Sequence, residues 1–276
     1  MPELPEVETV ANGVHARVRG QRIVSVWLSR YSEPFKTSRA EMAEALTGMR
    51  IMRVYREGKH IVFDLGGPER TSKMSAQWIV HLGMTGRLLV STPEAPAPPH
   101  THAVLGLSGG RELRFVDPRR FGRLTLHRIE DNGSFRGPGR DPLTISGEDF
   151  VALFRGRKLA IKAALLNQTL LHGVGNIYAD ESLFRAGIRP TRPAGRLGPE
   201  RLLRLHAALK EILRKAIELG GSSVSDYVDA DGVAGFFQLE HRVYMRTGEP
   251  CLLCGRSIKR IVLAGRGTHY CAHCQR

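Results

Sequence analysis

The first residues of the chain carry groups that could do covalent chemistry. The sequence begins Met1-Pro2-Glu3-Leu4-Pro5-Glu6, and we expect cellular removal of Met1 to leave Pro2 as the amino terminus. An α-amino group has a pKa near ~8, so a useful fraction of it is neutral and nucleophilic at cellular pH. Attack of this secondary amine on an aldehyde-like carbon would give an iminium ion, with Glu3 close enough to exchange a proton. The same residues also suit an ordinary helix start, because proline favours the first turn and carboxylates favour its positive end.

Four cysteines form a second chemical signal near the other end of the chain. They occur as Cys251-Leu252-Leu253-Cys254 and Cys271-Ala272-His273-Cys274. Two such pairs can place four thiolates at the corners of a tetrahedron, the geometry that Zn²⁺ accepts, and a reducing cytosol argues against disulfides. A closed four-sulfur site has no position open for water, so we predict one structural Zn²⁺ ion that folds a segment too short for its own core. A redox role for either pair is the alternative, but neither follows a strand and opens a helix, as redox pairs usually do.

The charge of the chain indicates the kind of partner it meets. Its 276 residues include 41 Lys and Arg against 27 Asp and Glu, a net charge of +14. Such an excess attracts polyanions, and nucleic acid is the commonest polyanion that a protein encounters. The start of the chain lacks the basic flank and apolar run of a signal peptide, and no apolar stretch approaches the ~20 residues that span a bilayer. We therefore expect a cytoplasmic protein that binds nucleic acid.

The elements that must position these residues differ between the two halves of the chain. Apolar residues at helical spacing predict a helix over residues 3–18, ended by Gly20. A capping-box pattern at Ser38 predicts a short helix that ends at Gly48. Otherwise the first half is rich in strand signals, at residues 22–28, 51–55, 60–65, 78–90, 103–107 and 112–116. Several strands with short turns favour a sandwich or barrel.

The second half is predicted to be helical. Glycine, proline and polar residues make 131–145 the best candidate for a linker. Helices are then expected over residues 146–154, 160–171, 176–186 and 199–219, followed by a polar, glycine-bearing loop from Ser222. Between the cysteine pairs, residues 258–270 predict a β-hairpin with a basic tip at Arg266. The fold class is therefore α+β.

Five motifs in this order resemble the formamidopyrimidine-DNA glycosylase family of bacterial base-excision repair enzymes, which act on oxidised purines. They are the first six residues, the segments Asp117-Pro118-Arg119-Arg120-Phe121-Gly122 and Gly173-Val174-Gly175-Asn176-Ile177-Tyr178, the four cysteines, and Arg266-Gly267-Thr268. The resemblance covers Pro2 to Arg276, and Leu4 is similar to the purine-repair branch rather than to the endonuclease VIII branch, which tends to have glycine there. It implies an N-terminal β-sandwich domain (1–130), a linker (131–145), a helix-two-turns-helix domain (146–240) with a lesion loop near 222–237, and a zinc ribbon (241–276).

The resemblance also implies a mechanism. Pro2 would displace the damaged base and bond to the sugar C1′, while Glu3 serves as acid and base. Lys59 matches the family lysine that donates a proton in β-elimination, and Arg266 matches the arginine of δ-elimination. The enzyme would thus be both a glycosylase and a lyase. Beside Lys59 the sequence departs from the common pattern, with Glu57 where a basic residue is frequent and His60 where an aromatic residue is frequent, so we expect altered surface charge there rather than lost chemistry.

The remaining family positions concern DNA. Met84, Arg119 and Phe121 match the residues that fill the hole left by a flipped base. Core packing is the ordinary alternative for Met84 and Phe121, but flanking glycines and an adjacent arginine pair favour an exposed loop for both. Positions that contact the DNA backbone in the family map onto four residues: His100, Arg157, Lys162 and Asn176. The implied partner is double-stranded DNA that contains oxidised purines or abasic sites, bound by a monomer associated with the bacterial nucleoid.

Two other functions fit parts of the pattern. A glycosylase for oxidised pyrimidines would share the whole architecture and differ in the excised base. A non-catalytic zinc-ribbon DNA-binding protein would keep the positive charge and the four thiolates but would need no free amine at Pro2. Comparing the excision of 8-oxoguanine with that of thymine glycol distinguishes the oxidised-pyrimidine glycosylase from the oxidised-purine enzyme. Borohydride trapping of a covalent adduct distinguishes either enzyme from the non-catalytic DNA-binding protein.

Overall fold

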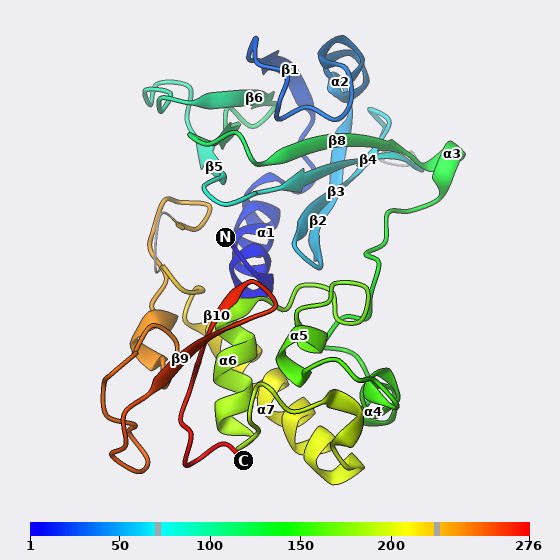
Figure 1. Ribbon diagram of the computed structural model, residues 1–276. Coiled ribbons are helices and arrows are strands. Elements are labelled where there is room, and N and C mark those ends of the chain that lie inside the picture. The colour runs from blue at the N-terminus through cyan, green and yellow to red at the C-terminus, as the bar shows by residue number, and fades with distance from the viewer. Residues whose placement is uncertain (70–72, 224–226) are drawn as a thin grey trace. The chain divides into compact units, whose positions relative to one another are not determined.

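The computed structural model describes residues 1–69, 73–223 and 227–276. The chain divides into two compact units (Figure 1). The first comprises residues 1–136 and 220–235, and the second comprises residues 137–219 and 236–276. The change of unit after residue 136 falls inside the predicted linker. Residues 220–235, which the sequence grouped with the helical domain, belong to the first unit, and positions 224–226 of the predicted lesion loop lie outside the described residues.

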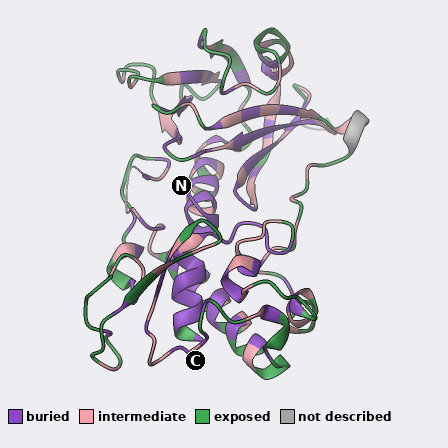
Figure 2. Ribbon diagram, viewed as in Figure 1, coloured by how far each residue is buried: buried purple, intermediate pink, exposed green. Residues whose placement is uncertain are grey.

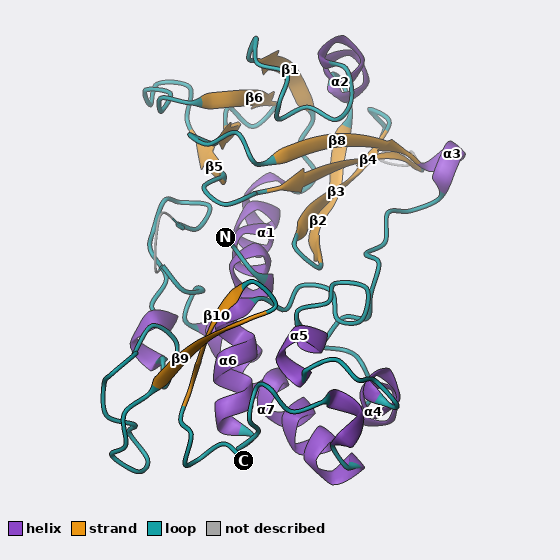
Figure 3. Cartoon of the chain, in the orientation of Figure 1, coloured by secondary structure: helices purple, strands orange, loops and turns teal. Residues whose placement is uncertain are grey.

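In its described part, the first unit contains two four-stranded antiparallel sheets (Figure 3). One has the strand order β1-β6-β7-β5 and the other has the order β2-β3-β4-β8. The strands are β1 (Ile23–Leu28), β2 (Arg50–Glu57), β3 (His60–Gly66), β4 (Met74–His81), β5 (Arg87–Ser91), β6 (Thr101–Leu107), β7 (Glu112–Val116) and β8 (Arg123–Arg128). The predicted sandwich is thus confirmed.

Helix α1 (Leu4–Val18) contributes its apolar stripe to the core that both sheets share. The apolar residues whose helical spacing predicted this helix are all buried: Leu4, Val7, Val10, Ala11, Val14 and Val18. Gly20 follows with a φ of 81°. Two shorter helices complete the unit, α2 (Arg39–Leu46) and α3 (Ile129–Asn132). The hydroxyl of Ser38 accepts a hydrogen bond from the N–H of Glu41 at the start of α2, as the capping-box pattern predicted.

One sequence prediction in this unit was wrong in a way that matters for the site. The strand expected over residues 78–90 is two strands, β4 and β5, separated by a turn at residues 82–86. Gly83 in this turn has a φ of 66°, a conformation that residues other than glycine rarely adopt. The turn exposes Met84 instead of burying it in the sheet.

The second unit is mainly helical. Its helices are α4 (Gly147–Phe154), α5 (Ile161–Leu165), α6 (Asn176–Arg185), α7 (Pro199–Glu218) and the short 3₁₀ segments η1 (Ala194–Arg196) and η2 (Phe237–Glu240). Helix α6 is buried along most of its length (Figure 2). The helix predicted over 160–171 ends at Leu165, because the side chain of Asn167 accepts hydrogen bonds from Thr169 and forms a turn. Among the described residues, no helix is long and apolar enough to cross a membrane.

The predicted hairpin near the C-terminus is confirmed. Strands β9 (Lys259–Leu263) and β10 (Arg266–Tyr270) pair in antiparallel register, with Arg266 opposite Leu263. The two turn residues, Ala264 and Gly265, have φ values of 49° and 72°. Positive φ at both positions matches the twist that a two-residue hairpin turn requires. Arg266 therefore lies directly beside the tip.

Candidate functional site

The predicted nucleophile lies immediately before α1. Pro2 is buried and Glu3 is the N-cap of the helix. The carboxylate of Glu3 accepts the N–H of Glu6, and the Glu6 carboxylate accepts the N–H of Glu3 at 2.8 Å, which completes a capping box. The helix start that the sequence offered as the ordinary explanation is therefore real. The capping box also fixes the Glu3 carboxylate one residue from Pro2. At this position the carboxylate could exchange a proton with a group that the Pro2 amine attacks.

Glu6 connects this helix start to a distant part of the same unit. Its second carboxylate oxygen accepts the N–H of Ser222 at 2.8 Å, and the hydroxyl of Tyr227 donates to the Glu6 carbonyl at 3.3 Å. Burial, together with the charge of Glu6, raises the pKa of Tyr227 and keeps the phenol protonated. Ser222 and Tyr227 of the predicted lesion loop are thus attached to Glu6 in the first turn of α1.

Lys59 lies in the tight turn between β2 and β3, after Gly58, whose φ is 59°. Its side chain is 8% exposed. The hairpin is held to α1 by an ion pair between Arg56 and Glu8, with 2.6 Å between Nε and Oε2, and by a hydrogen bond from the Val54 N–H to Nδ1 of His15. Lys59 is therefore not an ordinary surface lysine, because its turn is anchored to α1 and its side chain is mostly buried.

Met84 and Phe121 lie on two loops that touch. A Cβ atom added to Gly83 would lie 2.5 Å from the backbone nitrogen of Gly122 and 2.6 Å from the carbonyl carbon of Phe121. Only glycine permits this approach. Met84 is 42% exposed and Phe121 48%, so neither is packed in the core. The guanidinium carbon of Arg119 lies 4.8 Å from the centre of the Phe121 ring, a cation–π contact.

Asp117 organises both loops, a role that the sequence reasoning did not assign. This fully buried carboxylate accepts hydrogen bonds from Thr85 (2.5 Å), from the N–H of Arg119 (3.2 Å) and from the N–H of Gly122 (2.7 Å). The sequence does carry a signal for this role, because an aspartate that precedes a proline between two strands often fixes a turn through its side chain. The N–H of Asp117 also donates to the carbonyl of His100, which is exposed and has a φ of 64°. The structure thus brings Met84, His100, Arg119 and Phe121 into one neighbourhood.

The predicted DNA contact of Lys162, in the second unit, does not agree with the position of its side chain. The resemblance placed it among contacts to the DNA backbone, but its side chain is completely buried. Its ammonium lies 2.7 Å from a carboxylate oxygen of Asp180 and donates to the Gly267 carbonyl at 2.9 Å and to the Thr268 hydroxyl at 2.8 Å. Removing one partner of a buried ion pair is costly, because the other charge stays behind. Lys162 therefore holds the start of β10 against α5 and α6 instead of reaching an external phosphate.

Two of the other predicted residues of this unit, Asn176 and Arg266, lie beside the contacts of Lys162. Asn176, at the first position of α6, donates from its amide to the same Gly267 carbonyl at 2.9 Å. The second oxygen of Asp180 accepts the N–H of His269 at 2.9 Å. Arg266, one residue before Gly267, stays exposed. Arg157 is exposed after α4 and donates from Nε to the Leu153 carbonyl. The structure brings Lys162, Asn176 and Arg266 together and leaves Arg157 at a separate turn.

A second buried carboxylate holds the segment that leads to the ribbon. Glu181 accepts the backbone N–H groups of Arg242, Val243 and Tyr244 at 2.8–3.1 Å. Burial raises the pKa of Glu181, while these three donors act in the opposite direction. Before this segment, His241 packs between the rings of Phe237 and Tyr244, and burial lowers its pKa to about 4.

We expect the free energy of unfolding to decrease as the pH falls from about 6.5 to 4, because His241 is neutral when folded. In this window the unfolded chain, whose histidine has the ordinary pKa of 6.5, binds more protons than the folded chain does. The difference between the two pKa values corresponds to about 3 kcal/mol. Urea unfolding at several pH values, with zinc held constant, should give a flatter profile for His241→Phe, which keeps an aromatic ring. Identical pH profiles would contradict this assignment.

The four cysteines fit the predicted metal. Their sulfur atoms all lie within 4.8 Å of one another, with 3.9 Å between Cys251 and Cys274 and 3.5 Å between Cys254 and Cys271. Zn–S bonds of ~2.3 Å in a tetrahedron separate neighbouring sulfurs by about 3.8 Å. Cys251 and Cys271 also pack with Phe184, Val243 and Ile258 in a small core. One structural Zn²⁺ ion therefore closes the ribbon.

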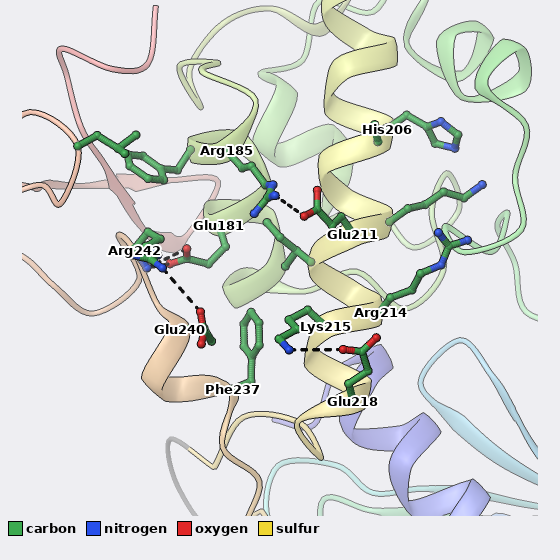
Figure 4. A pocket seen from close by; sticks show the side chains of 15 residues that line it. Glu181, Arg185, His206, Glu211, Arg214, Lys215, Glu218, Phe237, Glu240 and Arg242 are labelled. Atoms are coloured by element: carbon green, nitrogen blue, oxygen red, sulfur yellow. Dashed lines mark hydrogen bonds and ion pairs between the residues drawn. The ribbon is translucent and has the colours of Figure 1, made fainter.

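A large hollow of about 1040 Å³ lies elsewhere in the second unit, between α6, α7 and η2 (Figure 4). None of the predicted site residues lines it. Its charged walls are largely neutralised by the ion pairs Arg185 with Glu211, Lys215 with Glu218, and Arg242 with Glu240. Volume therefore does not identify the functional site of this molecule.

Comparison with known proteins gives a consistent result over the whole chain. Residues 1–124 match the formamidopyrimidine-DNA glycosylase N-terminal domain, residues 139–228 match the formamidopyrimidine-DNA glycosylase H2TH domain, and residues 248–276 match the zinc finger found in FPG and IleRS. A formamidopyrimidine-DNA glycosylase of Solibacter usitatus is 45% identical over 276 residues, covering 100% of both chains.

Solved structures agree. The MutM (Fpg) protein of Thermus thermophilus is 41% identical, with a TM-score of 0.84, over 99% of this chain and 98% of that one. The wild-type Lactococcus lactis Fpg in complex with N7-benzyl-Fapy-dG containing DNA is 36% identical, with a TM-score of 0.88, over 100% of both chains. The fold is shared along nearly the full length of both chains.

Proposed function

Because the chain belongs to the formamidopyrimidine-DNA glycosylase family, we propose that it excises oxidised purines, such as 8-oxoguanine and formamidopyrimidines, from double-stranded DNA and then cleaves the strand. The observation that carries the proposal is the amino terminus, where the capping box fixes Glu3 directly beside Pro2. The net charge of +14 suits a polyanionic substrate. We place the enzyme, acting as a monomer, in the bacterial cytoplasm and in association with the nucleoid.

The chemistry begins at the freed nitrogen of Pro2. The amine attacks C1′ of the damaged nucleotide, the base leaves, and the nitrogen remains bonded to the sugar carbon. Glu3 protonates the ring oxygen as the sugar opens to the iminium ion. Because the iminium withdraws electrons, the adjacent C2′ proton becomes acidic, and its removal expels the 3′ phosphate. A second elimination expels the 5′ phosphate and leaves a one-nucleotide gap.

Cations assist the two eliminations. Lys59, in its anchored turn, would donate a proton during the first. Arg266 would bind the second leaving phosphate, which its planar guanidinium can contact with two parallel hydrogen bonds. The buried pair of Lys162 and Asp180 supports the backbone beside Arg266. Lys162 would thus act as a positioning residue, while Asn176, His100 and Arg157 would contact the DNA backbone.

A flipped base leaves a hole in the duplex that must be filled. Met84 and Phe121 are exposed apolar side chains on touching loops, as wedges that separate stacked bases require. Arg119, held against Phe121, would donate hydrogen bonds to the abandoned cytosine.

Arg119→Ala should lower discrimination between cytosine and the other opposite bases by about tenfold, since a good side-chain contact to a base contributes ~1–3 kcal/mol. The affinity of the protein for duplex DNA, which depends on contacts to the DNA backbone, should change little. Excision rates from four duplexes that differ only opposite the lesion provide the measurement, with the exposed Arg111→Ala as a charge-matched control. An equal loss with every opposite base would refute the role of Arg119 in the hole.

The experiment that tests the proposed function combines two substrates and one trap. Borohydride reduces an iminium ion to a stable amine, so incubation with duplex containing 8-oxoguanine should yield a covalent protein–DNA adduct. A duplex with thymine glycol should yield far less. Preference for thymine glycol would indicate the oxidised-pyrimidine alternative, and the absence of an adduct on any lesion would indicate a non-catalytic DNA-binding protein.

A further inference from the structure

We propose that a basic and aromatic hollow on the first unit, which shares His100 with the proposed DNA contacts, binds unpaired nucleotides without the covalent chemistry at Pro2. The hollow, of about 580 Å³, lies beside the end of β1 and is lined by residues of β1, the following loop, α2 and the start of β6. Its lining residues are Trp27, Leu28, Ser29, Arg30, Tyr31, Arg39, His100, Thr101 and His102. No carboxylate is among them, so the hollow presents only positive and neutral groups.

Two large aromatic side chains are exposed at its rim. Trp27 is 54% exposed and Tyr31 41%. Packing in the core explains neither, and burying a ring of this size is normally favourable. Trp27 lies on β1, the edge strand next to β6 in the described sheet, with Val104 opposite. Its indole is therefore accessible from solvent, which suits stacking of a nucleobase.

The cations are held in place around these rings. The guanidinium carbons of Arg30 and Arg120 lie 5.5 Å and 4.7 Å from the centre of the Tyr31 ring. Arg39, on α2, donates to the Ser29 carbonyl at 2.9 Å. Glu33 pairs with Arg120 at 2.9 Å, so it neutralises the outer cation and leaves Arg30 and Arg39 for a ligand.

The floor of the hollow is polar and rigid. The hydroxyl of Ser29 and Nδ1 of the buried His102 lie 3.1 Å apart, and Nε2 of His102 lies 3.0 Å from the Asp117 carbonyl. The ring of His102 meets Tyr31 edge-on, with 5.8 Å between centroids. Tyr31 is thus held in place at the rim, which reduces the entropy that binding would cost.

Together these features select the ligand by chemistry. A basic groove with exposed aromatic rings is the pattern with which proteins bind single-stranded nucleic acid, because every base has a face that can stack and every nucleotide carries a phosphate. A paired base within a duplex presents no free face to an indole. An acidic peptide would satisfy the arginines but would leave the indole without a role. The proposed ligand is therefore an unpaired strand, which goes beyond the duplex that the proposed function requires.

The test uses the fluorescence of the intact, zinc-loaded protein. Of its two tryptophans, Trp27 is exposed and Trp78 is 1% exposed, so quenching by a stacked base reports on this hollow. We expect a short oligothymidylate to quench the emission, Trp27→Phe to lose the response, and Arg30→Ser combined with Arg39→Ser to raise the apparent Kd about tenfold. Arg111→Ser, in the turn after β6 at the opposite end of the β1–β6 pair, is the charge-matched control.

The outcomes separate this inference from the proposed function. Pro2→Gly should quench as wild type does, while the double arginine variant should still form the borohydride adduct on a blunt lesion duplex. Absence of quenching in wild type, or an unchanged Kd in the double arginine variant, would overturn the inference. Equal displacement of the oligothymidylate by oligoglutamate of matched charge would also overturn it, in favour of an acidic peptide site.

Discussion

Pro2→Gly should reduce borohydride-trapped adduct by at least ~10³-fold, the largest effect that we expect of any single substitution. Pro2 supplies a secondary amine in a rigid ring, one residue before the Glu3 carboxylate that the capping box fixes. Glycine leaves a primary amine without that ring, so the nitrogen is no longer held for attack on C1′. The measurement is the fraction of labelled 8-oxoguanine duplex that migrates with the protein after reduction.

Two controls make the result specific to the amine. Insertion of an alanine between Met1 and Pro2 keeps the proline but converts its nitrogen to an amide, so it should also prevent adduct formation. This variant and Pro2→Gly should both keep zinc and bind lesion-free duplex as wild type does, since neither changes the capping carboxylates. Intact mass establishes whether Met1 is removed. Full activity in a chain that retains Met1 would rule out the proline mechanism.

Cys254→Ser should release Zn²⁺ and weaken binding to lesion duplex by about 100-fold or more. Structural zinc sites of this kind contribute much of the folding free energy of the segment that they close. Cys251 and Cys271 also belong to the small core that contains Phe184. Without zinc, the two cysteine-bearing turns and the strand that carries Arg266 should therefore become disordered. Zinc content is measured by a colorimetric chelator and affinity by fluorescence anisotropy.

The segment between Cys251 and Cys254 provides the matched control. Leu253 is 74% exposed beside Cys254, so Leu253→Ser should retain both zinc and affinity. A Cys254→Ser protein that has lost its zinc and still binds with unchanged affinity would show that the ribbon does not take part in DNA binding.

The parts of the fold that the sequence predicted well are those with local, repetitive signals. The apolar spacing of α1, the serine cap of α2 and the glycine-bounded hairpin of the ribbon each follow from neighbouring residues. The break between β4 and β5 was missed because Leu82 and Met84 suit a strand as well as a turn. What decides the matter is the contact of Gly83 with the Phe121 loop, far along the chain. Strand β8, which pairs with β4, was also not predicted.

The candidate site shows the same division between local and distant information. Its residue types could be named from motifs, but the placement of Lys162 depends on Asp180 and on Gly267, which lie on other elements. A lysine on an amphipathic segment normally faces water, and only this pairing explains its complete burial. Asp117 was visible as part of a motif that also contains two of its hydrogen-bond donors, the N–H groups of Arg119 and Gly122, but its third donor, Thr85, comes from a distant loop that the sequence alone does not bring to it.

The contact at Gly83 bears on how this protein can diverge. Since the backbones that carry Met84 and Phe121 leave no room between them for even a methyl group, neither loop can lengthen or change shape without a compensating change in the other. Variants selected for other side chains at Met84 or Phe121 should therefore acquire paired mutations, one in residues 82–86 and one in residues 117–122. Replacing one of these two loops with that of a relative should succeed only when the other loop is replaced as well.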